Sequence, residues 1–188
     1  MVRSLLAYLG HLSLTHNNKT QLFRCLGWIP VLFGAVAFGT LCLFSFTCHA
    51  IEYEGGDFRL GPWYYQDADD TCSLLPESII DEDGTWTFVK GWTIVTSVIG
   101  GLWTIWLGLF NFVLRQISPE LWNLANLSLS LFMTLSTGLL FLFLNSNACE
   151  SDAVENLWGV QFQQDDCEMG MGAKANIAAV LCWAITGV

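Results

Sequence analysis

Charged residues are scarce in this sequence, and four long stretches lack them altogether. Of the 188 residues, 13% are charged and 53% are hydrophobic, whereas an ordinary soluble domain is about 25% charged. Asp, Glu, Lys and Arg are missing from residues 26–48, 91–114, 121–144 and 175–188. A surface helix of a soluble protein carries a polar face at helical period, so these stretches argue against a soluble fold.

The first three uncharged stretches are long enough to cross a membrane as helices. They contain 23, 24 and 24 residues, and about 20 apolar residues span the hydrocarbon layer. The fourth contains 14 residues up to Val188, which fits either a short or re-entrant segment or the start of a fourth span. We favour the start of a span in a chain that continues. The predicted fold is an all-α membrane protein, a bundle of four transmembrane helices with the fourth truncated.

The segments between the stretches divide by charge. Residues 1–25 contain three basic residues and no acids, and the link 115–120 contains one charge of each sign. Residues 49–90 contain ten acids and 145–174 contain six, with three basic residues between them. Lys and Arg are retained on the cytoplasmic side during insertion. We therefore expect 1–25 and 115–120 to be cytoplasmic and the two acidic segments to be outer loops, in a multi-pass protein of the plasma membrane or an endomembrane.

Signatures of catalysis are missing. The sequence contains no G-x-S-x-G, no H-E-x-x-H and no phosphate-binding glycine loop, the local patterns of common hydrolases and nucleotide enzymes. Ionisable groups inside a membrane are the usual mark of a transporter, and the uncharged stretches have no acidic or basic residue. We expect a protein that is not an enzyme, has no cofactor and binds no nucleic acid, with the lipid bilayer, other membrane proteins or its own copies as partners.

Four of the seven cysteines map to the predicted outer side. They are Cys48, Cys72, Cys149 and Cys167, and an even number on an oxidising face is what disulfides require. We favour pairs within each loop, Cys48 with Cys72 and Cys149 with Cys167, and a cross-link between the loops remains an alternative. Zinc is disfavoured, because structural sites bring cysteines in close pairs such as C-x2-C. Cys25, beside Arg24 near the inner interface, is a candidate for palmitoylation.

Two acidic clusters in the first loop could attract cations. The clusters are Asp67, Asp69 and Asp70, and Asp81, Glu82 and Asp83. A helix-loop-helix calcium site needs acids at alternate positions, a central glycine and a final glutamate. Neither cluster has this pattern, so we expect weak and nonspecific cation association and no metal site.

The first loop also contains candidate strands, and the helices contain candidate packing sites. Residues 58–65 and 85–89 are rich in aromatic and β-branched residues and could pair as short strands. The step at Gly61 and Pro62 would then be a turn or edge position. Glycines such as Gly34, Gly100 and Gly108 would let helix backbones approach closely in lipid.

The layout of spans and loops resembles the claudin and peripheral-myelin-protein group of four-helix membrane proteins. Claudin first loops have a G-L-W turn followed by cysteines, on a small outer β-sheet. Here Gly61, Pro62 and Trp63 occupy that position, Cys72 follows, and Lys90 precedes the second helix. Pro62 replaces the usual Leu, and the loop lacks the second cysteine. The two cysteines of the second loop resemble tetraspanins, but the C-C-G motif is missing.

The resemblance implies a structural, adhesive or partner-organising protein with a disulfide-stapled outer surface. In a claudin-like protein, Asp67, Asp69 and Asp70 would tune the passage of cations between cells. The alternative is an accessory subunit of a larger membrane complex, such as a channel, a receptor or a pigment-protein assembly.

Overall fold

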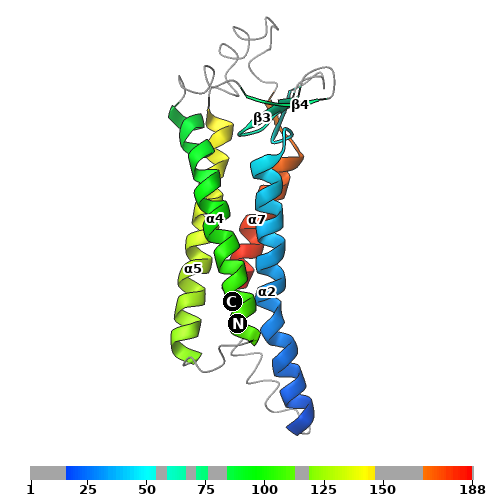
Figure 1. Ribbon diagram of the computed structural model, residues 1–188, viewed down its shortest axis with the longest axis vertical. Coiled ribbons are helices and arrows are strands. Elements are labelled where there is room, and N and C mark those ends of the chain that lie inside the picture. The colour runs from blue at the N-terminus through cyan, green and yellow to red at the C-terminus, as the bar shows by residue number, and fades with distance from the viewer. Residues whose placement is uncertain are drawn as a thin grey trace, which may run out of the picture.

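Long helices dominate the structure, a computed structural model that describes residues 16–53, 59–66, 71–75, 84–112, 119–146 and 167–187. Helix α2 comprises His16–Phe46, α4 comprises Gly84–Phe112 and α5 comprises Pro119–Leu139, which continues as the 3-10 helix η1 (Leu140–Asn145). Helix α7 (Met171–Thr186) is shorter. Figure 1 shows these helices running alongside one another, with a small sheet at one end.

Three helical segments are long and apolar enough to cross a membrane. They are Trp28–Phe46, Gly84–Phe110 and Glu120–Asn145, of 19, 27 and 26 residues. Their surfaces expose large aliphatic side chains such as Leu102 and Leu135, as expected where lipid replaces water. These segments indicate a membrane-embedded protein. Helix α7 is apolar but has only 16 residues.

Buried residues recur along α2, α4 and α7 with alternating spacings of three and four. The repeat comprises Gly34, Ala37, Leu41 and Phe44 in α2, Trp86, Val89, Thr93, Thr96, Gly100, Trp103 and Leu107 in α4, and Gly172, Asn176, Ala179, Trp183 and Thr186 in α7. A spacing that averages 3.5 keeps one narrow seam of a helix facing its neighbour. Helix α7 packs against both α2 and α5, and α4 packs against α2.

Two of the predicted glycine sites are close-packed. A Cβ added at Gly34 would lie 3.0 Å from Leu107 Cδ1, and one at Gly100 would lie 3.0 Å from Met133 Cε. Around Gly108, by contrast, no atom of the described residues outside its own helical turn lies within 4 Å of such a Cβ. Glycine therefore permits close helix approach at Gly34 and Gly100, whereas Gly108 faces open space.

Hydrogen bonds to backbone carbonyls also link the helices. Asn176 Nδ2 donates to the Thr137 carbonyl at 3.1 Å, and Asn126 Nδ2 donates to the Thr186 carbonyl at 2.8 Å. Ser130 Oγ donates to the carbonyl of Trp183. All three bonds join α5 to α7. In lipid such bonds contribute on average about 0.6 kcal/mol each, so they supplement close packing.

The expectation of a strand at residues 85–89 is wrong, because these residues form the first turns of α4. Their β-branched and aromatic content resembles a strand, but Trp86 and Val89 are buried while Thr87 and Phe88 are exposed. The alternating spacing of three and four continues to Thr93 and Thr96, so the buried residues share one helix face. The Trp86 ring packs edge-on against Phe143 of η1, with centroids 5.5 Å apart.

The sheet has five short strands, all paired antiparallel. They are β1 (Ile51–Tyr53), β2 (Arg59–Leu60), β3 (Tyr64–Gln66), β4 (Cys72–Leu74) and β5 (Cys167–Met169), in the spatial order β4-β3-β2-β1-β5. Four strands come from the first loop, and β5 comes from the residues just before α7. Residues 59–66 thus contain two strands and a turn, where the sequence predicted one strand.

Candidate functional site

The segment between α2 and β1, residues 47–50, is the point where the bundle and the sheet meet. It is enclosed by three glycines from distant parts of the chain. A Cβ at Gly61 would overlap the Thr47 carbonyl oxygen, and a Cβ at Gly170 would overlap the His49 carbonyl. A Cβ at Gly172 would lie 2.5 Å from the Thr47 Cγ2 methyl and 3.2 Å from Ala50 Cα. At Gly61 and Gly170 the obstacles are backbone atoms, so only glycine fits there without a shift of the chain.

Backbone hydrogen bonds hold the same segment to the start of α7. The Gly170 N–H donates to the Ala50 carbonyl at 3.0 Å, and the Gly172 N–H donates to the His49 carbonyl at 2.8 Å. Strand β1 continues this contact by pairing Ile51 with Met169. The described strands that follow α2 and precede α7 therefore belong to one sheet, which is joined to the ends of both helices.

A disulfide joins Cys48 to Cys72, whose Cα atoms lie 6.0 Å apart. This confirms the first of the two predicted pairs. The bond connects the end of α2 to β4, the edge strand farthest from β1, so it closes the first loop across the sheet. Cys48 is 1% exposed, whereas Cys72 lies at the exposed edge. The second predicted pair lies outside the described residues at Cys149, and Cys167 begins β5.

The predicted motif of Gly61, Pro62 and Trp63 forms the turn between β2 and β3. The Gly61 N–H donates to the Tyr64 carbonyl at 2.7 Å and closes the turn. The indole Nε1 of Trp86 in α4 donates to the Pro62 carbonyl at 3.3 Å. The turn thus packs on the first residues of α4 and covers the buried Trp86.

Trp63 makes two polar contacts with α4. Its Nε1 donates to Thr93 Oγ1 at 3.1 Å, and Lys90 Nζ lies 4.6 Å from the centroid of its ring. A cation at this distance is attracted to an aromatic ring by about 0.5–1 kcal/mol at an exposed site. Lys90, which marks the boundary of the second span in the sequence, therefore also helps to hold the sheet.

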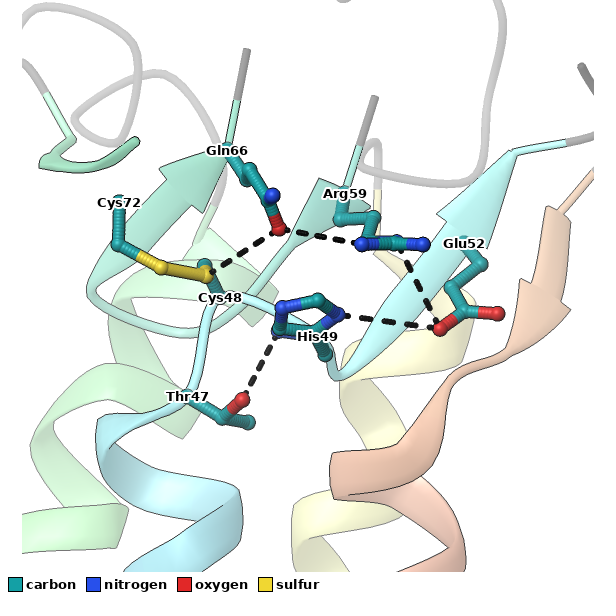
Figure 2. The surroundings of a disulfide bond; sticks show 7 residues. All are labelled: Thr47, Cys48, His49, Glu52, Arg59, Gln66 and Cys72. Carbon is teal, nitrogen blue, oxygen red and sulfur yellow. Dashed lines mark hydrogen bonds and ion pairs between the residues drawn. A yellow bond between two sulfur atoms is a disulfide. The ribbon is translucent and has the colours of Figure 1, made fainter. Parts of the chain in front are cut away.

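A polar network surrounds the disulfide, as Figure 2 shows. Glu52 Oε1 lies 3.9 Å from His49 Nδ1 and 3.8 Å from Arg59 Nε. Arg59 Nη1 donates to Gln66 Oε1 at 3.4 Å. The same oxygen lies 3.7 Å from Cys48 Sγ, which carries no hydrogen in the disulfide and only contacts it. The registers of β1, β2 and β3, which pair Glu52 with Arg59 and Arg59 with Gln66, align these side chains.

Cys48, His49 and Cys72 also bring three potential metal ligands together. The two sulfur atoms and one imidazole nitrogen all lie within 4.8 Å of one another. The sequence pattern did not predict this group, because Cys72 is 24 residues from Cys48 and the familiar zinc patterns have close pairs. The sequence contains one indication of this group, the adjacent Cys48 and His49. That pair indicates a metal site only when the fold of the sheet is known.

The other candidate residues lie outside the described parts. The two acidic clusters, with Asp67, Asp69 and Asp70 in one and Asp81, Glu82 and Asp83 in the other, belong to residues 67–70 and 76–83, which the structure does not describe. Cys25 lies in α2, within the turns whose side chains are also outside the description.

Comparison with known proteins gives no assignment, because the chain matches no protein-family profile and no curated protein.

Proposed function

We propose that this chain is a tetraspan membrane protein with a structural, adhesive or partner-organising role, in the manner of the claudins. In this proposal α7 is the fourth span. Its buried residues continue the packing of α2 and α5 on both sides, which supports a position inside the same bundle. Its 16 residues are fewer than the roughly 20 that cover a bilayer.

The observation that carries the proposal is the single sheet built from both loops. Strand β1 follows α2, β5 precedes α7, and the two strands pair. The disulfide and the three glycines fix this sheet to the helices. A rigid surface suits binding, because less conformational freedom is lost when a partner docks.

The sheet end also presents apolar side chains away from the helix seams. Leu74 on the edge strand β4 is 65% exposed. Met169 in β5, at the opposite edge of the sheet, and Met171 at the start of α7 are 42% and 76% exposed. An edge strand offers unpaired backbone groups to another strand. We propose that the β4 edge, with Leu74, binds a membrane protein or another copy of the chain.

The proposed orientation has the sheet outside and the N-terminus in the cytoplasm. Disulfides persist on the oxidising side of membranes, and Cys48–Cys72 lies in the sheet. The basic residues at 1–25 favour a cytoplasmic N-terminus. The turn of Gly61, Pro62 and Trp63, set in a small sheet, supports the claudin resemblance, in which the loop acids would tune cation passage.

Clustering of proteoliposomes tests the adhesive role. The full chain is reconstituted in vesicles with two dyes, and we expect mixed clusters that protein-free vesicles do not form. Leu74→Glu should reduce clustering because it places a charge on the apolar edge. Ser73→Glu is the matched control, since neighbouring side chains on a strand point to opposite faces. Equal clustering by both variants would contradict a contact through Leu74.

Purification of the full chain from its own membrane tests the alternative. A stoichiometric partner that is retained after detergent extraction would favour an accessory subunit over self-association. Uptake or turnover of a solute by the chain alone in liposomes would refute both readings.

A further inference from the structure

The disulfide and the histidine beside it have the composition of a zinc site. Cys48 and His49 are neighbours in the sequence, and in an extended strand their side chains would point to opposite faces. They lie instead in a bend between α2 and β1, where the His49 N–H donates to Thr47 Oγ1 at 3.1 Å. Both side chains consequently approach Cys72, and the three ligand atoms lie within 4.8 Å of one another.

The orientation of the imidazole supports metal binding. Figure 2 shows one ring nitrogen, Nδ1, facing Glu52 while the other side of the ring is turned toward the disulfide. A carboxylate hydrogen-bonded to the far nitrogen is the usual arrangement of a zinc-bound histidine, because it fixes the ring and makes it more basic; Glu52 Oε1 is on that side of the ring, 3.9 Å from Nδ1, which is longer than a hydrogen bond. Gln66 Oε1, 3.7 Å from Cys48 Sγ, is a further oxygen beside the group.

We propose that the Cys48–Cys72 disulfide is a redox switch whose reduced form binds Zn²⁺. The ligands are the two thiolates and the His49 imidazole, a donor set that zinc prefers. Glu52 is a positioning residue that acts through His49. Two thiolates and one Zn²⁺ are together neutral, so the bound site can lie near the Arg59 guanidinium without a net repulsion. The oxidised and the zinc-bound forms exclude each other, because the disulfide sulfurs are not thiolates.

The step balances with a dithiol as reductant. The S–S bond accepts two electrons and two protons and becomes two thiols, while the dithiol is oxidised to its own disulfide. Zn²⁺ then replaces the two thiol protons, which are released to solvent. In vitro a tertiary phosphine serves instead, since it becomes the phosphine oxide by taking its oxygen from water.

Cobalt binding to the full chain in detergent tests the proposal. The protein is reduced with a phosphine, freed of it, and titrated with Co²⁺, whose bonds to thiolates absorb in the near ultraviolet. Reduced wild type should show this band, oxidised wild type should not, and Zn²⁺ should abolish it by displacement. His49→Gln should weaken binding by more than Glu52→Gln, which removes only an outer partner and should cost roughly 10- to 100-fold. Cys182→Ser, a free cysteine of α7, is the matched control and should bind as wild type.

A second measurement identifies the ligands. Mass spectrometry of iodoacetamide-treated reduced protein should show that Zn²⁺ slows alkylation of Cys72 in wild type, and that the same Zn²⁺ concentration slows it less in His49→Gln. Thermal unfolding of the oxidised His49→Gln protein should match wild type, which shows that the variant folds. Cobalt affinity that is unchanged in His49→Gln, or alkylation of Cys72 that Zn²⁺ does not slow, would overturn the proposal.

Discussion

Replacement of Gly61, in the turn between β2 and β3, by alanine should destabilise the protein more than the same replacement at Gly34, Gly100 or Gly108 of the helices. The new Cβ would overlap the Thr47 carbonyl oxygen and lie 3.0 Å from the Thr47 carbonyl carbon and 3.3 Å from Cys48 Cα. These are backbone atoms, so no side chain can rotate away. Overpacking costs about 1–3 kcal/mol, and we expect the upper end, about 3 kcal/mol. At roughly 2–4 °C per kcal/mol for a chain of this size, Tm should fall by about 6–12 °C.

The assay is thermal unfolding of the full chain in detergent under oxidising conditions, followed by circular dichroism. Gly108→Ala is the matched control, because the part of the chain that the structure describes has no atom from beyond that helical turn within 4 Å of the added Cβ. Alanine is also the better helix former by about 1 kcal/mol, so the control should not lose stability. If Gly61→Ala lowers Tm no more than Gly108→Ala does, the turn between β2 and β3 does not pack against the end of α2.

Three further substitutions test other contacts. Cys72→Ser should lower the free energy of unfolding by about 3–4 kcal/mol, since it opens a loop with a sequence separation of 24, and a phosphine should then destabilise wild type by more than it destabilises the variant. Trp63→Phe removes the hydrogen bond to Thr93 and should lower the free energy of unfolding by about 1 kcal/mol. A double-mutant cycle with Thr93→Val that shows no coupling would exclude a stabilising hydrogen bond between these two side chains. Asn176→Leu should change the free energy of unfolding by no more than about 1 kcal/mol. The substitution loses one hydrogen bond to the Thr137 carbonyl, but it also removes a buried amide oxygen that has no partner among the described residues. A loss of 3 kcal/mol would refute this balance.

The membrane-embedded helices could be predicted because their signal is local. A run of more than 20 residues without charge is typical of a spanning helix whatever its neighbours are. The beginning of α4 was misread for the same reason, since Thr85 to Val89 resemble a strand when they are taken alone. Trp86 and Val89 belong to a row of buried residues that continues to Leu107. The helical spacing of this row can be recognised only when the residues on both sides of Lys90 are considered together.

The disulfide could be predicted in part, and its surroundings could not. Location on an oxidising face limited the pairing to four cysteines, and preference for a closure within one loop selected Cys48 with Cys72. The approach of His49 depends on the bend at residues 47–50 and on the order of the strands. Likewise, the pairing of β1 with β5 joins residues more than 100 positions apart, and the sequence of neither strand indicates which strand it pairs with.

Cys48 is enclosed where the bundle and the sheet meet, and this determines which sulfur atom of the Cys48–Cys72 pair can move. It follows Phe44 by four residues and continues the buried spacing of α2, while the linker around it is held by three glycines. Cys72 lies on the exposed edge strand. Two thiolates on one zinc ion, with Zn–S bonds of about 2.3 Å, stand about 3.8 Å apart, so reduction must separate the sulfurs. Because Cys48 is enclosed, the displacement falls on β4, and the redox state of the disulfide should therefore alter the edge of the sheet that we propose as the binding face.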